Sequence, residues 1–255
     1  MGIDLDKGAY LNPRIDPRTN EALGRWSKTV AFTDQYSHLL SFKPEFVLVF
    51  VATPLRGNRL SFEYVANALG SAWDFTGPNS EYAVLSTLPI GAMGQFRRAW
   101  PRMALIYTPP MVRKVDFLAT FRDPPSNWQL FGGDPSLALR SLFRQAQSPH
   151  VRQIVADPET VEWAKLLTNA VLSTKVVLAN AIGGQLGERA KEVCKIVNAD
   201  PRTGEGYFTP GGPASGPCLP RDLTELAEVT TGDLHSFLAI LNSLNGTKEI
   251  VSALV

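Results

Sequence analysis

The chain has 255 residues, of which 44% are hydrophobic and 19% charged, and its 25 basic and 24 acidic residues leave a net charge of +1. This composition suits a globular protein with a buried core, and the balanced charge argues against binding of nucleic acid or an anionic membrane through bulk electrostatics. Two cysteines, Cys194 and Cys218, do not indicate a disulfide framework. We expect an intracellular protein, in the cytoplasm or, after removal of a targeting sequence, in an organelle matrix.

The first half of the chain alternates predicted strands and helices. The longest apolar run, FVLVFVA at 46–52, is too short to span a membrane and is typical of a strand buried on both faces of a parallel sheet. Such alternation with short Gly/Pro connections indicates a parallel α/β layer. Further strands are predicted at 82–87, 103–110 and 128–133, and helices at 60–73 and 92–100.

The second half is predicted to be mostly helical. Residues 158–190 form one long helical pattern, with Pro158 suited to its first turn. A helix of this length suits a spine between domains or subunits. We therefore divide the chain into residues 1–148 and 149–255. Apolar residues at three- and four-residue steps predict a core-packing stripe along the helix, consisting of Val161, Ala164, Leu167, Val171, Leu178 and Ile182.

No metal site is expected. His38, His150 and His235 are scattered without metal-ligand spacing, and no Ser/His/Asp constellation is recognisable. The basic, aromatic run at 96–102 is more typical of a solvated helix face than of an RNA contact.

The helical half carries a specific combination of motifs. Lys165 and Asn169 are four residues apart on the predicted helix, Asp200-Pro201-Arg202 follows it, and Cys218-Leu219-Pro220-Arg221-Asp222 comes next. In this order the stretch 163–226 resembles the central part of the UDP-glucose/GDP-mannose dehydrogenase family. The resemblance implies NAD-dependent oxidation of a sugar C6 alcohol to a carboxylate in two steps. It also implies catalytic positions at Cys218, Lys165, Asn169 and Asp222.

The first half resembles the family more loosely. The segment GIDLDKGAYLN at 2–12 is similar to the family's second strand, whose acidic residue holds the adenosine ribose, and this places Asp4 in that role. Thr53 and Thr87 lie at predicted strand ends, where α/β proteins bind ligands. The resemblance therefore implies cofactor binding by Asp4, Thr53 and Thr87. A simpler role for the two threonines is capping of the helices that follow.

Several positions depart from the family pattern. The sequence begins at the second strand, so the Gly-x-Gly-x-x-Gly turn that holds a dinucleotide pyrophosphate is not in it. Pro110 stands where the family has a glutamate that manages protons, and a proline carries none. The second nucleotide-binding domain also does not follow. Further departures are Lys114, Ala181, Pro213, Ser215 and Pro217.

These departures define the predicted fold and function. We expect an α/β protein with a truncated Rossmann-like parallel sheet lacking its first strand, followed by a mostly helical, dimerisation-type domain with a long central helix. The predicted function is a non-catalytic structural or accessory subunit that uses no cofactor and whose site residues are vestigial. Its expected partners are other subunits, bound through helix 158–190 and the exposed sheet edge, with a homodimer among them. The alternatives are an NAD-dependent UDP-glucose/GDP-mannose 6-dehydrogenase, of which this chain is a fragment or which another chain completes, and a nucleotide-sugar binding sensor.

Overall fold

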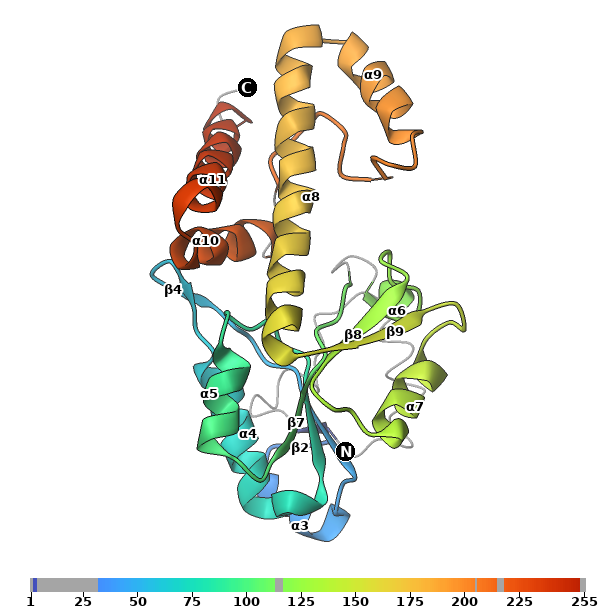
Figure 1. The fold of residues 1–255 in the computed structure, drawn as a ribbon, viewed down its shortest axis with the longest axis vertical. Coiled ribbons are helices and arrows are strands. Elements are labelled where there is room, and N and C mark those ends of the chain that lie inside the picture. The colour runs from blue at the N-terminus through green and yellow to red at the C-terminus, as the bar shows by residue number, and fades with distance from the viewer. Residues whose placement is uncertain (1, 4–31, 113–116, 205, 215–217, 253–255) are drawn as a thin grey trace. The chain divides into compact units, whose positions relative to one another are not determined.

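The computed structural model describes residues 2–3, 32–112, 117–204, 206–214 and 218–252 (Figure 1). The candidate ribose ligand Asp4 lies outside these residues, as do Lys114, Ser215 and Pro217. The chain forms two compact units: a sheet unit of residues 1–53 and 62–161, and a helical unit of residues 54–61 and 162–255. The division falls after Val161 rather than at residue 148, because the strand at 152–156 belongs to the sheet.

The sheet unit contains a five-stranded sheet in the order β3-β6-β7-β8-β9. All neighbouring strands are parallel except β7 and β8, which pair antiparallel at Tyr107 and Gly132. The predicted Rossmann-like α/β class followed by a mostly helical part is confirmed, with this one antiparallel pair as a departure from an all-parallel sheet. The strands are β3 (Phe46–Val49), β6 (Glu81–Val84), β7 (Ala104–Tyr107), β8 (Trp128–Gly132) and β9 (Arg152–Ala156).

The antiparallel pair determines which face each helix covers. Helices α4 (Glu63–Thr76) and α5 (Ala92–Ala99) connect β3, β6 and β7, whereas α7 (Leu137–Ala146) connects β8 and β9. Because crossovers between parallel strands are right-handed, reversing the strand direction after β7 moves the connecting helix to the opposite face. Figure 1 accordingly shows α4 and α5 on one face of the sheet and α7 on the other.

The core of the sheet unit consists of apolar side chains from both layers. One cluster joins the strands to α7, and the Ser136 hydroxyl caps α7 by accepting a hydrogen bond from the Leu139 amide at 3.0 Å. The cluster residues are Ala83, Leu85, Ile106, Phe131, Leu139 and Phe143. The remaining elements of the unit are β1 (Gly2–Ile3), β2 (Phe32–Thr33), η1 (Tyr36–His38), α3 (Leu39–Phe42), η2 (Gly77–Asn79) and α6 (Phe117–Arg122).

The helical unit is organised around one long helix. Helix α8 (Pro158–Leu186) ends four residues earlier than predicted, because Gly187 adopts a φ of 53°, a left-handed conformation that suits glycine at a helix end. The other elements are α9 (Arg189–Asn198), α10 (Leu219–Val229), α11 (Gly232–Ser252), β4 (Leu55–Arg56) and β5 (Arg59–Leu60).

The predicted apolar stripe of α8 is wrong in part. Val171 and Leu178 are 61% and 52% exposed. Polar residues occupy much of the buried face instead, so apolar spacing alone did not locate it. The buried polar residues of α8 are Glu162, Lys165, Asn169, Ser173 and Asn180.

Helix α8 has the length and the apolar composition of a segment that could span a membrane. In the described part of the chain it is the one helix long and apolar enough to cross a membrane. A core helix of a globular domain can have the same length and composition. The buried polar side chains of α8 are typical of such a core helix.

Candidate functional site

The candidate catalytic residues of the helical unit meet where α8 faces the start of α10. Lys165 and Asn169 lie one turn apart on α8, and both are buried. The Asn169 side-chain amide donates a hydrogen bond of 2.6 Å to Oδ2 of Asp222. Asp222 is itself fully buried in the first turn of α10, so two helices far apart in sequence are joined by this bond.

A second cation accompanies this carboxylate. Arg221 donates from Nε to Oδ1 of Asp222 at 2.8 Å, and its Nη2 lies 2.7 Å from the same oxygen. Asp222 thus accepts hydrogen bonds at both oxygens, as a buried carboxylate requires. Sequence reasoning had treated Arg221 only as part of a motif.

Lys165 is buried within this cluster. Burial lowers the pKa of its ammonium below the ordinary value, because the charged form loses its hydration. The charges of Asp222 and Cys218 oppose this shift in pKa, whereas Arg221 reinforces it. A buried amine whose charge is this disfavoured is suited to binding an oxyanion or exchanging a proton.

Cys218 is the exposed member of this cluster. It immediately precedes α10, and its carbonyl oxygen accepts a bond of 2.9 Å from the Asp222 amide. The thiol of Cys218 interacts electrostatically with Lys165, so it lies near the other three residues of the cluster. The structure therefore gathers Cys218, Lys165, Asn169 and Asp222, and their catalytic role stays a prediction. The second cysteine, Cys194, is buried in the α9 region.

Two asparagines fix the loop that leads to Cys218. Asn180 on α8 donates to the Gly212 carbonyl at 2.6 Å and accepts from the Gly211 amide at 3.0 Å. Asn245 on α11 accepts from the Ala214 amide at 2.7 Å and donates to the Ala214 carbonyl at 3.0 Å. Asn245 was missed by sequence reasoning, because no local pattern marks a residue that holds a loop 31 positions away.

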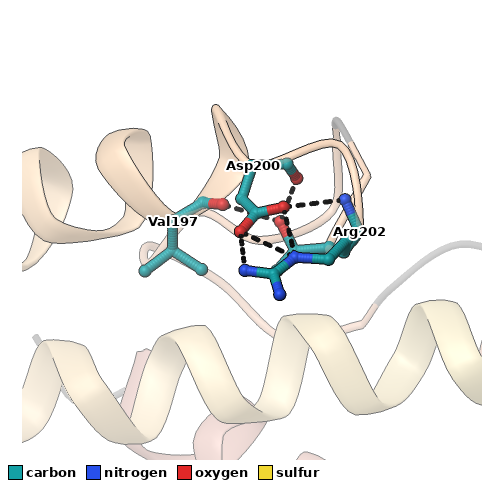
Figure 2. A network of polar contacts seen from close by, with 4 residues as sticks. Val197, Asp200 and Arg202 are labelled. Atoms are coloured by element: carbon teal, nitrogen blue, oxygen red, sulfur yellow. Dashed lines mark hydrogen bonds and ion pairs between the residues drawn. The ribbon is translucent and has the colours of Figure 1, made fainter.

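The Asp200-Pro201-Arg202 motif forms a closed turn after α9 (Figure 2). The Arg202 guanidinium donates to both oxygens of Asp200, which lowers the pKa of that carboxyl and raises the pKa of the guanidinium. The Thr203 hydroxyl donates to the Val197 carbonyl at 2.6 Å. Lys175 of α8 donates to the carbonyls of Thr203 and Gly204, which holds the turn against the long helix.

The candidate cofactor residues Thr53 and Thr87 belong to the sheet unit. Thr53 is only 4% exposed. Neither threonine caps a helix as predicted, because Phe62 and Gly91 occupy the positions before α4 and α5. Sequence reasoning missed Ser86. Its hydroxyl accepts a hydrogen bond of 2.8 Å from the Val51 amide and donates one of 2.8 Å to the Val51 carbonyl. These bonds connect the segment that follows β3 to the segment that follows β6.

Metal binding finds no support in the described ranges. Within them, no group of three or more His, Cys, Asp or Glu side chains could hold an ion.

The fold and this site together define a class: a Rossmann-like α/β unit combined with a helical unit that carries a thiol beside a buried lysine, asparagine and aspartate. Residues 159–245 match the model of the UDP-glucose/GDP-mannose dehydrogenase family, central domain. The resemblance to this family is thereby confirmed.

Individual proteins show the same resemblance. The chain is 23% identical over 239 residues to the UDP-glucose 6-dehydrogenase of Rickettsia conorii, covering 88% of this chain and 54% of the relative. It is 30% identical over 122 residues to the GDP-mannose 6-dehydrogenase of Pseudomonas syringae pv. syringae, covering 45% of this chain and 27% of the relative. The chain thus spans about half the length, or less, of these curated relatives.

Solved structures show the same fold. A UDP-D-ManNAc dehydrogenase from Pyrococcus horikoshii superposes with a TM-score of 0.84 at 19% identity, covering 99% of this chain and 63% of that one. A UDP-glucose dehydrogenase from Pyrobaculum islandicum gives a TM-score of 0.80 at 23% identity, covering 98% and 62%.

Proposed function

We propose that this chain is a nucleotide-sugar dehydrogenase-like protein that does not complete the oxidation by itself and serves as an accessory subunit of a larger assembly. The observation that carries the proposal is Pro110, which is buried just after β7. The resemblance places the proton-managing glutamate of the family at this position. A proline ring neither accepts nor donates a proton, so the acid–base step lacks its group.

The neighbourhood of Pro110 supports the same conclusion. The Thr108 hydroxyl donates to the Leu130 carbonyl at 2.7 Å and accepts from the Gln129 amide at 2.9 Å. The polar group nearest in sequence is therefore already engaged in the core and does not replace the missing carboxylate.

Asp222 also supports it. Both of its oxygens accept hydrogen bonds from protein side chains, one from Asn169 and one from Arg221. A carboxylate engaged in this way holds two helices together and has less capacity to orient a water molecule for hydrolysis of a thioester.

The resemblance implies NAD as the cofactor. A dinucleotide pyrophosphate needs a glycine-rich turn that opens a helix, and no Gly-x-Gly-x-x-Gly sequence occurs in the described ranges. The described residues therefore do not by themselves form a site for the NAD pyrophosphate.

The test is an activity measurement on the purified chain. UDP-glucose or GDP-mannose is supplied with NAD, and NADH is followed by its absorbance, with Cys218→Ser as the matched background. We expect no NADH above that background. Sustained NADH formation that is lost in Cys218→Ser would overturn the proposal.

A second candidate is a nucleotide-sugar dehydrogenase of which this chain is a fragment or which another chain completes. The gathering of Lys165, Asn169 and Asp222 beside Cys218 favours it, because a buried ammonium and an amide can stabilise the oxyanion of a thiohemiacetal formed on the thiol. Activity of the assembly isolated from its source, abolished by Cys218→Ser, would establish this candidate instead. A third candidate is a sensor that binds a nucleotide sugar without catalysis. Calorimetry with a nucleotide sugar in the absence of NAD tests it, and heat of binding would favour the sensor over the accessory subunit.

Exposed apolar side chains of the helical unit support the assembly role. Such side chains on helices mark interaction surfaces when they gather. The proposal includes an intracellular location and binding of other subunits through α8, with a second copy of the chain among them; size-exclusion chromatography of the native protein distinguishes these. The exposed residues are Val171 and Leu178 on α8 and Leu234, Phe237, Ile240 and Leu244 on α11.

A further inference from the structure

A short hairpin belongs to the helical unit although the chain on both sides of it belongs to the sheet unit. Residues 54–61 leave the sheet unit after Thr53 and return to it at Phe62. Strands β4 and β5 have two residues each, and Gly57 opens the turn with a φ of 62°. A two-stranded hairpin of this size is not stable alone in water, so its conformation depends on what it packs against.

The hairpin is held by a buried carboxylate. The side chain of Glu225 on α10 is 0% exposed. Its Oε2 accepts a hydrogen bond of 2.6 Å from the Leu60 amide, and the Arg59 Nε lies 3.3 Å from both carboxylate oxygens. A buried carboxylate without such donors is strongly unfavourable, and here the donors we describe come from the hairpin.

A second, exposed contact lies one turn further along α10. Asn58 donates to Glu228 Oε1 at 2.7 Å. Because Glu225 and Glu228 are three residues apart, both face the hairpin from the same side of the helix. The two contacts differ in burial, which makes Glu228 a matched control for Glu225.

The same helix presents the thiol. Cys218 directly precedes α10, and Asp222 lies one turn before Glu225. Asp222 fixes α10 to α8 through Asn169, and Glu225 fixes it to the hairpin. The position of the helix therefore depends on two buried carboxylates, one for each neighbour.

We propose that Glu225 is a positioning residue: it holds the 54–61 hairpin on α10 and thereby fixes the helix that presents Cys218 within the helical unit. The coupling runs from the Leu60 amide and the Arg59 guanidinium through the Glu225 carboxylate to α10. It holds whether or not the chain is catalytic, and its test does not use NADH formation.

The experiment compares Glu225→Ala, Glu225→Gln and Glu228→Ala in the full chain. Hydrogen exchange of the Leu60 amide is followed by NMR, and alkylation of Cys218 by iodoacetamide is measured across pH, with Cys218→Ser giving the background from buried Cys194. Glu225→Ala is expected to speed Leu60 exchange by about tenfold or more. It is also expected to change the Cys218 alkylation rate by about threefold or more, with an altered pH profile, because the thiol moves relative to Lys165.

The conservative variants complete the test. Glu225→Gln keeps an acceptor for the Leu60 amide but loses the charge beside Arg59, so intermediate effects are expected, whereas Glu228→Ala leaves both readouts unchanged. Faster Leu60 exchange without a change at Cys218, or an equal change at every pH, would overturn the coupling. Unchanged Leu60 exchange would overturn the contact itself. If Glu225→Ala does not fold, the same two measurements are made on Glu225→Gln and Arg59→Met. Unchanged Leu60 exchange and unchanged Cys218 alkylation in both variants would overturn the proposal.

Discussion

Asn169 and Asp222, 53 positions apart in the sequence, are joined by a hydrogen bond of 2.6 Å inside the helical unit. Both residues were singled out as candidate catalytic groups, yet the bond they form also holds α8 against α10. Arg221 binds the other oxygen of Asp222. A catalytic and a structural role therefore compete for the same carboxylate, and substitutions can separate them.

Replacing Lys165 by methionine is expected to raise the free energy of unfolding by about 1 kcal/mol, because a buried cation is exchanged for an apolar side chain of similar length while Asp222 keeps Arg221 and Asn169. The pKa of Lys165 is lowered in the folded state, so the unfolded chain holds this proton more tightly. Stability of the wild type therefore rises with pH as it approaches the unfolded value of about 10.4.

Urea titrations of wild type and Lys165→Met at neutral pH and in the alkaline range measure this difference, which should be largest at neutral pH and narrow as pH rises. A Lys165→Met protein that is clearly less stable than wild type would mean that the lysine stabilises the fold through Asp222. That outcome would favour an inherited structural role.

Asp222→Asn is expected to lower the free energy of unfolding by about 3 kcal/mol, because it leaves the buried Lys165 and the partly buried Arg221 without a neighbouring carboxylate. Thermal unfolding followed by circular dichroism measures the loss. Asp200→Asn is the matched control: the same change affects an ion pair with Arg202, whose side chain is 87% exposed, so a small effect is expected. Equal effects of the two substitutions would contradict the buried pairing.

Continuous apolar runs allowed the strands to be predicted. The segments at 46–52, 82–87, 103–110 and 128–133 each overlap an observed strand. Strands β6, β7 and β8 lie inside the described sheet, where burial on both faces favours apolar residues throughout. The prediction that 46–52 is buried on both faces is wrong, because β3 lies at an edge of that sheet and Leu48 is 49% exposed. Strand β9 was not predicted. Its residues Ile154 and Val155 are 41% and 44% exposed at the sheet edge, and an edge strand does not require such a run.

The helical unit was harder to predict, since hydropathy assigns polar residues to the surface. Lys165 and Asn169 are buried on α8 while Val171 faces outward. Hydropathy gave no indication that Lys165 and Asn169 are buried. Only the family resemblance, which marked both residues as functional, suggested that they face the interior of the unit. The contacts of Glu225 and Asn245 connect distant segments and leave no periodic signal, so sequence reasoning had no means of finding them.

Asn245→Ala is expected to lower the free energy of unfolding by about 2 kcal/mol, because the buried amide and carbonyl of Ala214 both lose their partner. Asn245→Asp is the informative control: its carboxylate still accepts from the Ala214 amide but cannot donate to the carbonyl. Urea unfolding should rank wild type above the aspartate variant. If Asn245→Ala unfolds like wild type, the loop before Cys218 does not depend on this contact.

Gly132→Ala tests the junction between the sheet and the start of α8. A Cβ at Gly132 would lie 2.9 Å from the Pro158 Cα and 3.2 Å from the Val161 Cβ, so backbone must shift and a loss of about 2 kcal/mol is expected. Gly184→Ala is the matched control, since its Cβ meets nothing within 4 Å inside helix α8; there the better helix propensity of alanine should stabilise the protein by about 0.5–1 kcal/mol. Opposite signs of the two effects in urea unfolding are the expected result, and a Gly132→Ala protein as stable as wild type would show that the junction has room for a methyl group.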